Sequence, residues 1–307
     1  MLNNKFAIVT LFLVLCNIVL AYAESEVKCI PEEMNFAACE TLAKQGDDDA
    51  LIMVGRFYEI GSGVEKNLGK AEEIYQQLAD KNNARGTNLL AMLKEDQGKK
   101  EEAIELYLKA AKLGSPSANN NLGMLYENNH DYVKAKEMYE IAIKEHNSSY
   151  AMMSLGDLYS DGLGGDENTE LAEKWYKESI QSGNDYAITR LGMLYGNLEK
   201  YDEAIKCYEV AIKKGDPVAM NSMGLLYQHG FGVKRDIQKA VKYYQDASNN
   251  DGVGGLIDLG LLYEKGLGVP QSYEKAVELY QRAHQLGYTD IQQRIDFLNK
   301  NFIKKDN

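Results

Sequence analysis

The stretch that decides the fold is residues 219–244, which read AMNSMGLLYQHGFGVKRDIQKAVKYY. Its first half follows the pattern A-x-x-x-L/M-G-x-x-Y from Ala219 to Tyr227, and its second half follows A-x-x-x-Y from Ala240 to Tyr244. Residues four and eight apart lie near one face of an α-helix, so each half predicts a helix with an apolar stripe. Glycines between the halves allow the backbone to turn where the first helix ends. The stretch therefore predicts a helical hairpin.

The same two-part pattern occurs seven times along the chain. Its first half starts at residues 50, 85, 118, 151, 187, 219 and 255. Its second half gives the pairs Ala71/Tyr75, Ala103/Tyr107, Ala135/Tyr139, Ala172/Tyr176, Ala204/Tyr208, Ala240/Tyr244 and Ala276/Tyr280. The second copy, Arg85-Leu89-Leu90-Leu93, is degenerate. Each hairpin exposes an apolar side that its neighbour must cover, so the repetition predicts an all-α fold, an α-solenoid superhelix of seven helical hairpins.

The small residues and the tyrosines predict how these helices pack. Glycine inside a helix costs about 1 kcal/mol relative to alanine, yet six of the seven copies keep it. We therefore expect glycine and alanine to let two helix axes approach closely, with tyrosines filling the space beside them. Thirteen of the 21 tyrosines fall on the two repeat positions, which favours core packing over platforms for bases or sugars.

The connection between the two helices has two lengths. The first positions of the two halves are 21 residues apart in the first, fourth, sixth and seventh copies, and 17 or 18 apart in the other three. In the long copies a residue of N-cap type stands four places before the second alanine: Asn67, Asn168, Asp236 and Ser272. The long copies, such as Gly230-Phe231-Gly232-Val233 through Tyr244, resemble Sel1-like repeats. The short copies, such as Tyr201 through Ile212, resemble tetratricopeptide repeats.

This resemblance covers residues 50–285 and implies that the first helices line a concave groove for a protein or peptide partner. The groove positions lie around each Leu-Gly pair. We predict the binding groove at Asn88, Asn121, Met124, Arg190, Met193, Asn221 and Leu225. Asparagine can donate and accept at once, and methionine and leucine offer adaptable apolar contacts, so this mixture suits a peptide. The alternative is that these residues only form the solvated inner wall.

The two ends of the chain predict a leader and two caps. Residues 1–23 combine Lys5, an apolar run and Ala21-Tyr22-Ala23, as a secretory signal peptide does; the alternative is an uncleaved anchor. Residues 24–49 would hold a capping segment with a half-repeat helix, and residues 50–286 the seven repeats. Residues 287–307 would form a C-terminal capping helix, with Ile291, Ile295 and Leu298 as its apolar side, and a tail.

Export would permit disulfides. Cys29 and Cys39 are close in sequence and are the pair that we predict to be bridged. Cys207 stands where the other repeats carry bulky apolar residues, so we interpret it as a packed thiol.

Few motifs in the sequence indicate a catalytic or metal-binding site. Ser272 and Lys275 match the S-x-x-K acylation motif, which matters because a cysteine-rich branch of Sel1-repeat proteins has been linked to β-lactam binding. Ser272 also stands at an N-cap position, and the cysteine pairs of that branch are absent. No Cys/His motif with metal spacing is present, so we predict no catalytic residue, no metal and no cofactor.

The composition limits the partners. A net charge of −12 argues against nucleic acid or an anionic membrane as the main partner. We therefore predict a non-enzymatic, exported scaffold or adaptor, periplasmic or secreted, that binds a protein or peptide in envelope function or host interaction. No stable membrane insertion is expected after signal cleavage. The alternatives are a cell-wall peptide or β-lactam hydrolase of the Sel1-repeat type, and a solenoid that works as a homo-oligomer.

Overall fold

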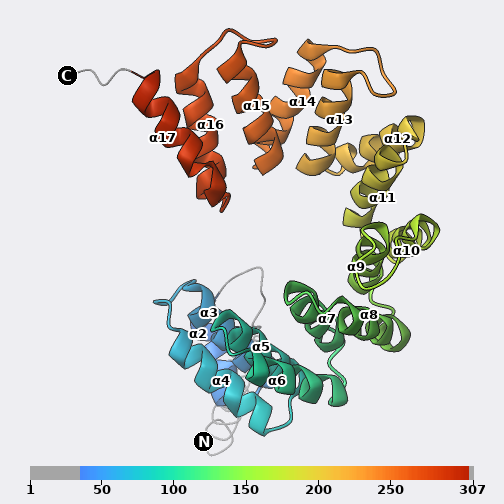
Figure 1. Cartoon of the computed structure of the whole chain (residues 1–307). Coiled ribbons are helices and arrows are strands. Elements are labelled where there is room, and N and C mark those ends of the chain that lie inside the picture. The colour runs from blue at the N-terminus through green and yellow to red at the C-terminus, as the bar shows by residue number, and fades with distance from the viewer. Residues whose placement is uncertain (1–34, 304–307) are drawn as a thin grey trace, which may run out of the picture. The chain divides into compact units, whose positions relative to one another are not determined.

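The computed structural model describes residues 35–303, and within them the chain is entirely helical. Between these residues lie sixteen α-helices and one short 3₁₀ helix, with no strand (Figure 1). The chain divides into two compact units, residues 1–122 and 123–307, and the boundary falls within α7 (Ala118–Asn128). Within each unit, successive helices pack against each other as in an α-solenoid, so the predicted fold class is confirmed.

In the described part of the first unit, helix α2 is followed by two hairpins. Its helices are α2 (Phe36–Lys44), α3 (Asp48–Ile60), α4 (Leu68–Asp80), α5 (Ala84–Asp96) and α6 (Lys100–Lys112). Each of these helices packs against the next one along the chain. The lone helix α2 lies against α3, where Phe36 packs beside Phe57 and Tyr58 in edge-to-face contacts.

The second unit continues the same arrangement. Its helices are α8 (Tyr132–His146), α9 (Ser149–Ser160), α10 (Thr169–Gln181), α11 (Tyr186–Asn197), α12 (Tyr201–Lys213), α13 (Pro217–His229), α14 (Ile237–Asn249), α15 (Val253–Lys265), α16 (Tyr273–Gln285), η2 (Thr289–Ile291) and α17 (Gln292–Asn301). We call α3, α5, α7, α9, α11, α13 and α15 first helices. Their hairpin partners, α4, α6, α8, α10, α12, α14 and α16, are the second helices.

The predicted interlock of glycine and tyrosine is confirmed. A Cβ atom placed on Gly192 would lie 2.7 Å from Cε1 of Tyr208, and one on Gly260 would lie 2.5 Å from Cε1 of Tyr280. The other pairs in this arrangement are Gly55/Tyr75, Gly123/Tyr139, Gly156/Tyr176 and Gly224/Tyr244. The seven tyrosines of the A-x-x-x-Y pattern are each between 0% and 4% exposed. The glycine therefore provides the space that the ring of the second helix occupies.

Most of the buried tyrosine hydroxyls have a partner on the first helix of their own hairpin. The hydroxyl of Tyr75 donates to Glu59 at 2.7 Å, and that of Tyr244 donates to Gln228 at 3.0 Å. The equivalent bonds in other repeats join Tyr107 to Glu95, Tyr139 to Glu127 and Tyr280 to Glu264. Tyr176 donates instead to Asp157, which lies about one turn earlier in its first helix. A buried hydroxyl without a partner is unfavourable, so these acceptors allow a tyrosine where phenylalanine would otherwise be expected.

The four predicted N-caps are present. The side chains of Asn67, Asn168, Asp236 and Ser272 each accept a hydrogen bond from the backbone N–H three residues later. These bonds satisfy one of the free N–H groups at the start of each second helix of the long repeats.

The register of the second repeat differs by one residue from the prediction. The side chain of Asn83 caps α5 by accepting from the N–H of Gly86, as Asp47 caps α3 by accepting from that of Ala50. Gly86 is therefore the equivalent of Ala50, and the repeat starts at residue 86 rather than at Arg85. Its close neighbour is Leu78, whose side chain leaves no room for a Cβ at Gly86.

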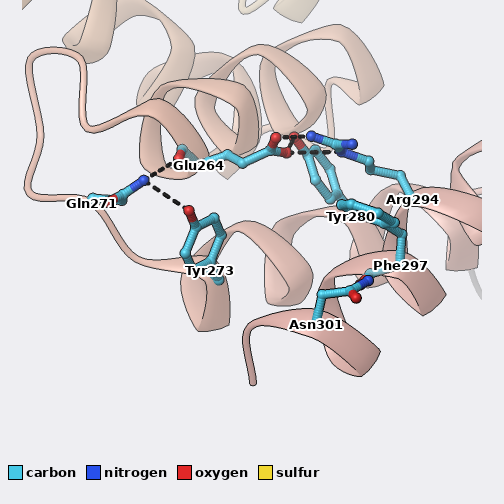
Figure 2. Close-up of polar contacts among 7 residues, drawn as sticks. All are labelled: Glu264, Gln271, Tyr273, Tyr280, Arg294, Phe297 and Asn301. Carbon is cyan, nitrogen blue, oxygen red and sulfur yellow. Dashed lines mark hydrogen bonds and ion pairs between the residues drawn. The ribbon is translucent and has the colours of Figure 1, made fainter. Parts of the chain in front are cut away.

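The last helix takes the place of a first helix of an eighth repeat. Ile291 follows Tyr280 by the same eleven residues that separate Tyr244 from Gly255. Ile295 and Leu298 are 3% and 0% exposed and pack against α16. Figure 2 shows Arg294 of α17 bound to both carboxylate oxygens of Glu264, which also accepts from Tyr280.

Three predictions fall wholly or partly outside residues 35–303. The signal peptide at residues 1–23 and Cys29 lie there, so the leader and the Cys29–Cys39 disulfide stay predictions. Cys39 itself is 1% exposed and packs with Val54 and Phe57. The final residues of the tail also lie outside the described part.

Candidate functional site: a neutral helix face in the second unit

Three first helices of the second unit lie in one row. α9 contacts α11, and α11 contacts α13, in addition to the contacts that each makes within its own hairpin. Corresponding positions on these helices therefore form a shared surface.

This row carries very few charges. Among the Asp, Glu, Lys and Arg side chains, α9, α11 and α13 contain only two, Asp157 and Arg190. By contrast, the second helix α10 alone contains five, namely Glu170, Glu173, Lys174, Lys177 and Glu178. The second helix α10 therefore carries more charged side chains than the three first helices of the row together.

Large apolar side chains of the same row are exposed. They are Tyr150, Tyr186, Met193, Val218 and Leu225, each between 37% and 65% exposed. We call these five residues, together with the Arg190–Asp157 pair among them, the neutral face. Single exposed apolar residues are common on proteins, but several on adjacent helices with only one ion pair among them are typical of interaction surfaces.

The two charges of the row offset each other. Nε of Arg190 lies 3.6 Å from Oδ1 of Asp157, and the same oxygen accepts a hydrogen bond of 2.7 Å from the hydroxyl of Tyr176. Burial raises the pKa of Asp157, while Arg190 and the Tyr176 hydroxyl act in the opposite direction. Among the described residues, no other polar contact engages the guanidinium of Arg190.

A pocket opens on the neutral face between α11 and α13. Its volume is about 300 Å³, and its walls include Met153, Tyr186, Arg190, Met193, Pro217 and Val218. The polar wall groups Thr189 and Asp216 are bonded to each other, at 2.5 Å. Asp216 also caps α13 by accepting from the backbone N–H groups of Val218 and Ala219.

A second hollow of about 390 Å³ adjoins the first and shares Tyr186, Asp216 and Pro217 with it. Its walls come from the start of α9 and the turns before α11 and α13. They include Tyr150, Asn184 and Lys214. Nζ of Lys214 lies 2.8 Å from Oδ2 of Asp185, so the charges of these two wall residues offset each other.

The predicted groove residues fall in both units. Asn88 and Asn121 belong to the first unit, and Met124, Arg190, Met193, Asn221 and Leu225 to the second. Within the second unit the structure places Arg190, Met193 and Leu225 together on the neutral face. Asn221 is half-buried, and its side chain donates to Asp258, whose pKa is raised by burial. A binding role for all seven residues stays a prediction.

The two asparagines of the first unit contact each other. The amide of Asn121 donates to Oδ1 of Asn88 at 3.2 Å. Because the repeat starts at residue 86, Asn88 is the equivalent of Asn120 and Asn221 rather than of Asn121. Asn88 is only 5% exposed, which leaves little of its side chain for a ligand.

The sequence prediction missed three members of the neutral face. Tyr150, Tyr186 and Val218 each stand one residue before the repeat alanine, outside the positions around the Leu-Gly pair. A usable signal was present, because an exposed position at a helix start ordinarily carries a polar residue. The lack of charges in α9, α11 and α13 was a second such signal.

The S-x-x-K residues have structural partners. The hydroxyl of Ser272 accepts from the N–H of Lys275 and donates to Glu274. Nζ of Lys275 lies 5.1 Å from the centre of the Tyr263 ring, as Lys70 and Lys239 lie over Tyr58 and Tyr227. The motif therefore coincides with the N-cap and the lysine–tyrosine contact of a long repeat.

Other features of the described residues add no chemistry. Cys207 is half-buried against the core, and burial raises the pKa of its thiol. From residue 35 to 303, no three His, Cys, Asp or Glu side chains are grouped as a metal site would require. Within the same part of the chain, no helix is long and apolar enough to span a bilayer.

Comparisons with known families identify the repeats. The Sel1 repeat model matches residues 48–83, 149–184, 217–251 and 255–288. Tetratricopeptide repeat models match residues 66–118, 116–145 and 186–213. The long copies were predicted to be Sel1-like repeats and the short copies tetratricopeptide repeats, and this assignment is confirmed. No curated protein matches the chain with significant similarity.

Solved structures share the fold. A Sel1 repeat protein from Oxalobacter formigenes is 23% identical, with a TM-score of 0.58 over 86% of this chain and 79% of that one. A protective antigen of uropathogenic Escherichia coli with an SLR fold is also 23% identical, with a TM-score of 0.55 over 88% of this chain. The match spans only 60% of the antigen's length. The chain is therefore a helical-repeat protein that carries both Sel1 repeats and tetratricopeptide repeats.

Proposed function

We propose that the protein is a non-enzymatic, exported scaffold that binds a segment of a protein partner on the neutral face of its second unit. Repeat proteins of this kind generally mediate protein–protein interaction. The observation that carries the proposal is the row α9, α11 and α13, which exposes five large apolar side chains beside a single, internally paired set of charges. Binding of a partner to a face of this composition is favourable, because it removes apolar surface from water.

The non-enzymatic part of the proposal rests on the partners of the candidate nucleophile. Ser272 is engaged as a helix cap, and the amino group of Lys275 lies over a tyrosine ring rather than beside the Ser272 hydroxyl. General-base activation would require the amine within hydrogen-bond reach of that hydroxyl. The two residues are therefore better explained by the repeat than by acylation.

A charge on the neutral face is expected to remove partner binding. Leu225→Glu places a carboxylate on an apolar contact surface, where it would lose hydration without gaining a partner. Wild type and variants are used as bait under identical conditions, and bound proteins are quantified. We expect at least one protein to be retained by wild type and lost, by about tenfold or more, with Leu225→Glu.

The matched control is Val210→Glu, on the second helix α12 of the same unit, where Val210 is similarly exposed. It should retain the partner that Leu225→Glu loses. An unchanged set of bound proteins with Leu225→Glu, or equal losses in both variants, would contradict the placement of the binding surface.

Export is expected to leave a mature protein that begins at Glu24. Residues 1–23 carry the charged, apolar and small-residue parts of a signal peptide, with Ala23 at the cleavage position. N-terminal sequencing of the protein isolated from its producing cells tests this directly. A chain that retains residues 1–23 would favour the uncleaved anchor instead. An exported scaffold of this kind would serve in the envelope or in contact with a host.

A further inference from the structure

We propose that the pocket between α11 and α13 is an anchor subsite for one large, uncharged apolar side chain, aromatic or leucine, of the bound segment. This inference rests on the proposed function and specifies the chemistry of its partner. The pocket lies on the neutral face, beside Tyr186 and Val218, and Met153 reaches it from α9.

The size of the pocket selects a side chain rather than a larger ligand. Its volume of about 300 Å³ lies at the lower end of small-molecule sites, which reach about 1,000 Å³. A single leucine or aromatic side chain can therefore enter it while the rest of the partner segment stays outside. The neighbouring hollow shares Tyr186, Asp216 and Pro217 with this pocket and can contact the next residues of the segment.

The walls favour apolar contact. Met153 and Met193 supply flexible thioether side chains, which adapt to branched or flat groups. Tyr186, Pro217 and Val218 add apolar surface around them. The polar groups of the wall already have hydrogen-bond partners, because Thr189 donates to Asp216, and Asp216 accepts from backbone N–H groups as the cap of α13.

The charges exclude an ionic anchor. Arg190 is paired with Asp157, and the Asp216 carboxylate accepts from Thr189 and caps α13, so a charged side chain would be desolvated there without an unpaired counterion. Arg190 has N–H groups beyond its 3.6 Å contact with Asp157, and these can donate to main-chain carbonyls of the segment. Such bonds orient a peptide without requiring a charge on it. The neutral row thus complements an uncharged segment.

The test uses the mature protein with ¹³C-labelled methionine methyl groups. The probes are N-acetyl-L-phenylalanine amide and N-acetyl-L-leucine amide, with N-acetyl-L-glutamine amide and N-acetyl-L-aspartate amide as polar controls. We expect the two apolar probes to shift the methyl signals of Met153 and Met193 saturably, with dissociation constants about tenfold below that of the glutamine probe. The signal of Met223, which is 2% exposed, should stay in place.

A matched pair of variants locates the binding. Val218→Asp and Val133→Asp change exposed valines at the same place in two helices, each two residues after an aspartate N-cap. Because a carboxylate at a helix start is favourable, neither change should unfold the protein. Val218→Asp should abolish the shifts, and Val133→Asp should leave them unchanged.

Three results would overturn the inference. They are the absence of a saturable shift in wild type, equal affinity for the glutamine probe, and equal behaviour of the two valine variants. If the probes caused no saturable shift but Leu225→Glu still lost the partner, the pocket assignment would be wrong and the proposed function would stand. Bound probes combined with a partner unaffected by Leu225→Glu would overturn the proposed function and, with it, the assignment of the pocket to a partner's side chain.

Discussion

Tyr244→Ala is expected to lower the free energy of unfolding by about 3–5 kcal/mol, the usual range for a buried aromatic residue. Tyr244 is 0% exposed, and its ring fills the space beside Gly224 in the hairpin of α13 and α14. Removal of the ring would leave a cavity between two helices that glycine has already brought close together. Urea denaturation followed by circular dichroism measures the change.

Two companion variants separate the causes of that loss. Tyr244→Phe removes only the 3.0 Å hydrogen bond to Gln228 and should cost about 1 kcal/mol. Tyr288→Ala changes a side chain that is 42% exposed and should stay within about 0.5 kcal/mol of wild type. If Tyr244→Ala were no more destabilising than Tyr288→Ala, the tyrosine interlock would be wrong.

Gly192→Ala and Gly196→Ala are expected to change stability in opposite directions, although both lie in α11 and are one turn apart. A Cβ on Gly192 would lie 2.7 Å and 2.9 Å from two ring atoms of Tyr208, and 3.1 Å from Cβ of Cys207. A Cβ on Gly196 would meet only the Tyr208 hydroxyl, at an ordinary 3.6 Å. Crowding at Gly192 should therefore outweigh the gain in helix propensity.

The expected sizes follow from two opposing effects. Alanine for glycine in a helix stabilises by about 1 kcal/mol, whereas overpacking a core costs about 1–3 kcal/mol. Gly196→Ala should thus raise the midpoint of denaturation, and Gly192→Ala should lower it. Two equally stabilised variants would show that the Tyr208 ring moves aside freely, and the reason given for the repeated glycine would fail.

The repeat architecture could be predicted because its signals are local and recur. Alanine, glycine and tyrosine at fixed helical spacing report close packing, and a single degenerate copy does not obscure six clear ones. The caps Asn67 and Ser272 could be predicted for the same reason, since an N-cap residue acts on a backbone N–H only three residues away.

The register of the second repeat could not be predicted from the same pattern. Its first helix lacks both the glycine and the tyrosine of the other copies, and Leu89 and Leu90 offer two equally apolar alignments. The structure resolves them through the Asn83 cap and through the Tyr107–Glu95 hydrogen bond, which has the same twelve-residue spacing as Tyr139–Glu127. The Tyr107–Glu95 hydrogen bond depends on how the two helices of a hairpin meet, which the pattern within one helix does not show.

The candidate surface was only partly predictable. The positions around the Leu-Gly pair led to Arg190, Met193 and Leu225, which lie on the neutral face. Tyr150, Tyr186 and Val218 were missed because a core-packing pattern says nothing about residues that point away from the core. Exposure of a large apolar side chain is a property of the folded chain, and it became visible only when neighbouring first helices were placed side by side.

The most direct test of the neutral face is photocrosslinking in the producing cells. A photoreactive amino acid is introduced at Met193, and separately at Val210 as a control on the second helix α12. We predict one dominant crosslinked partner from Met193 that is absent from Val210 and is lost when Leu225→Glu is added. Equal crosslinking from both positions, or a Met193 product unaffected by Leu225→Glu, would contradict a binding surface on α9, α11 and α13.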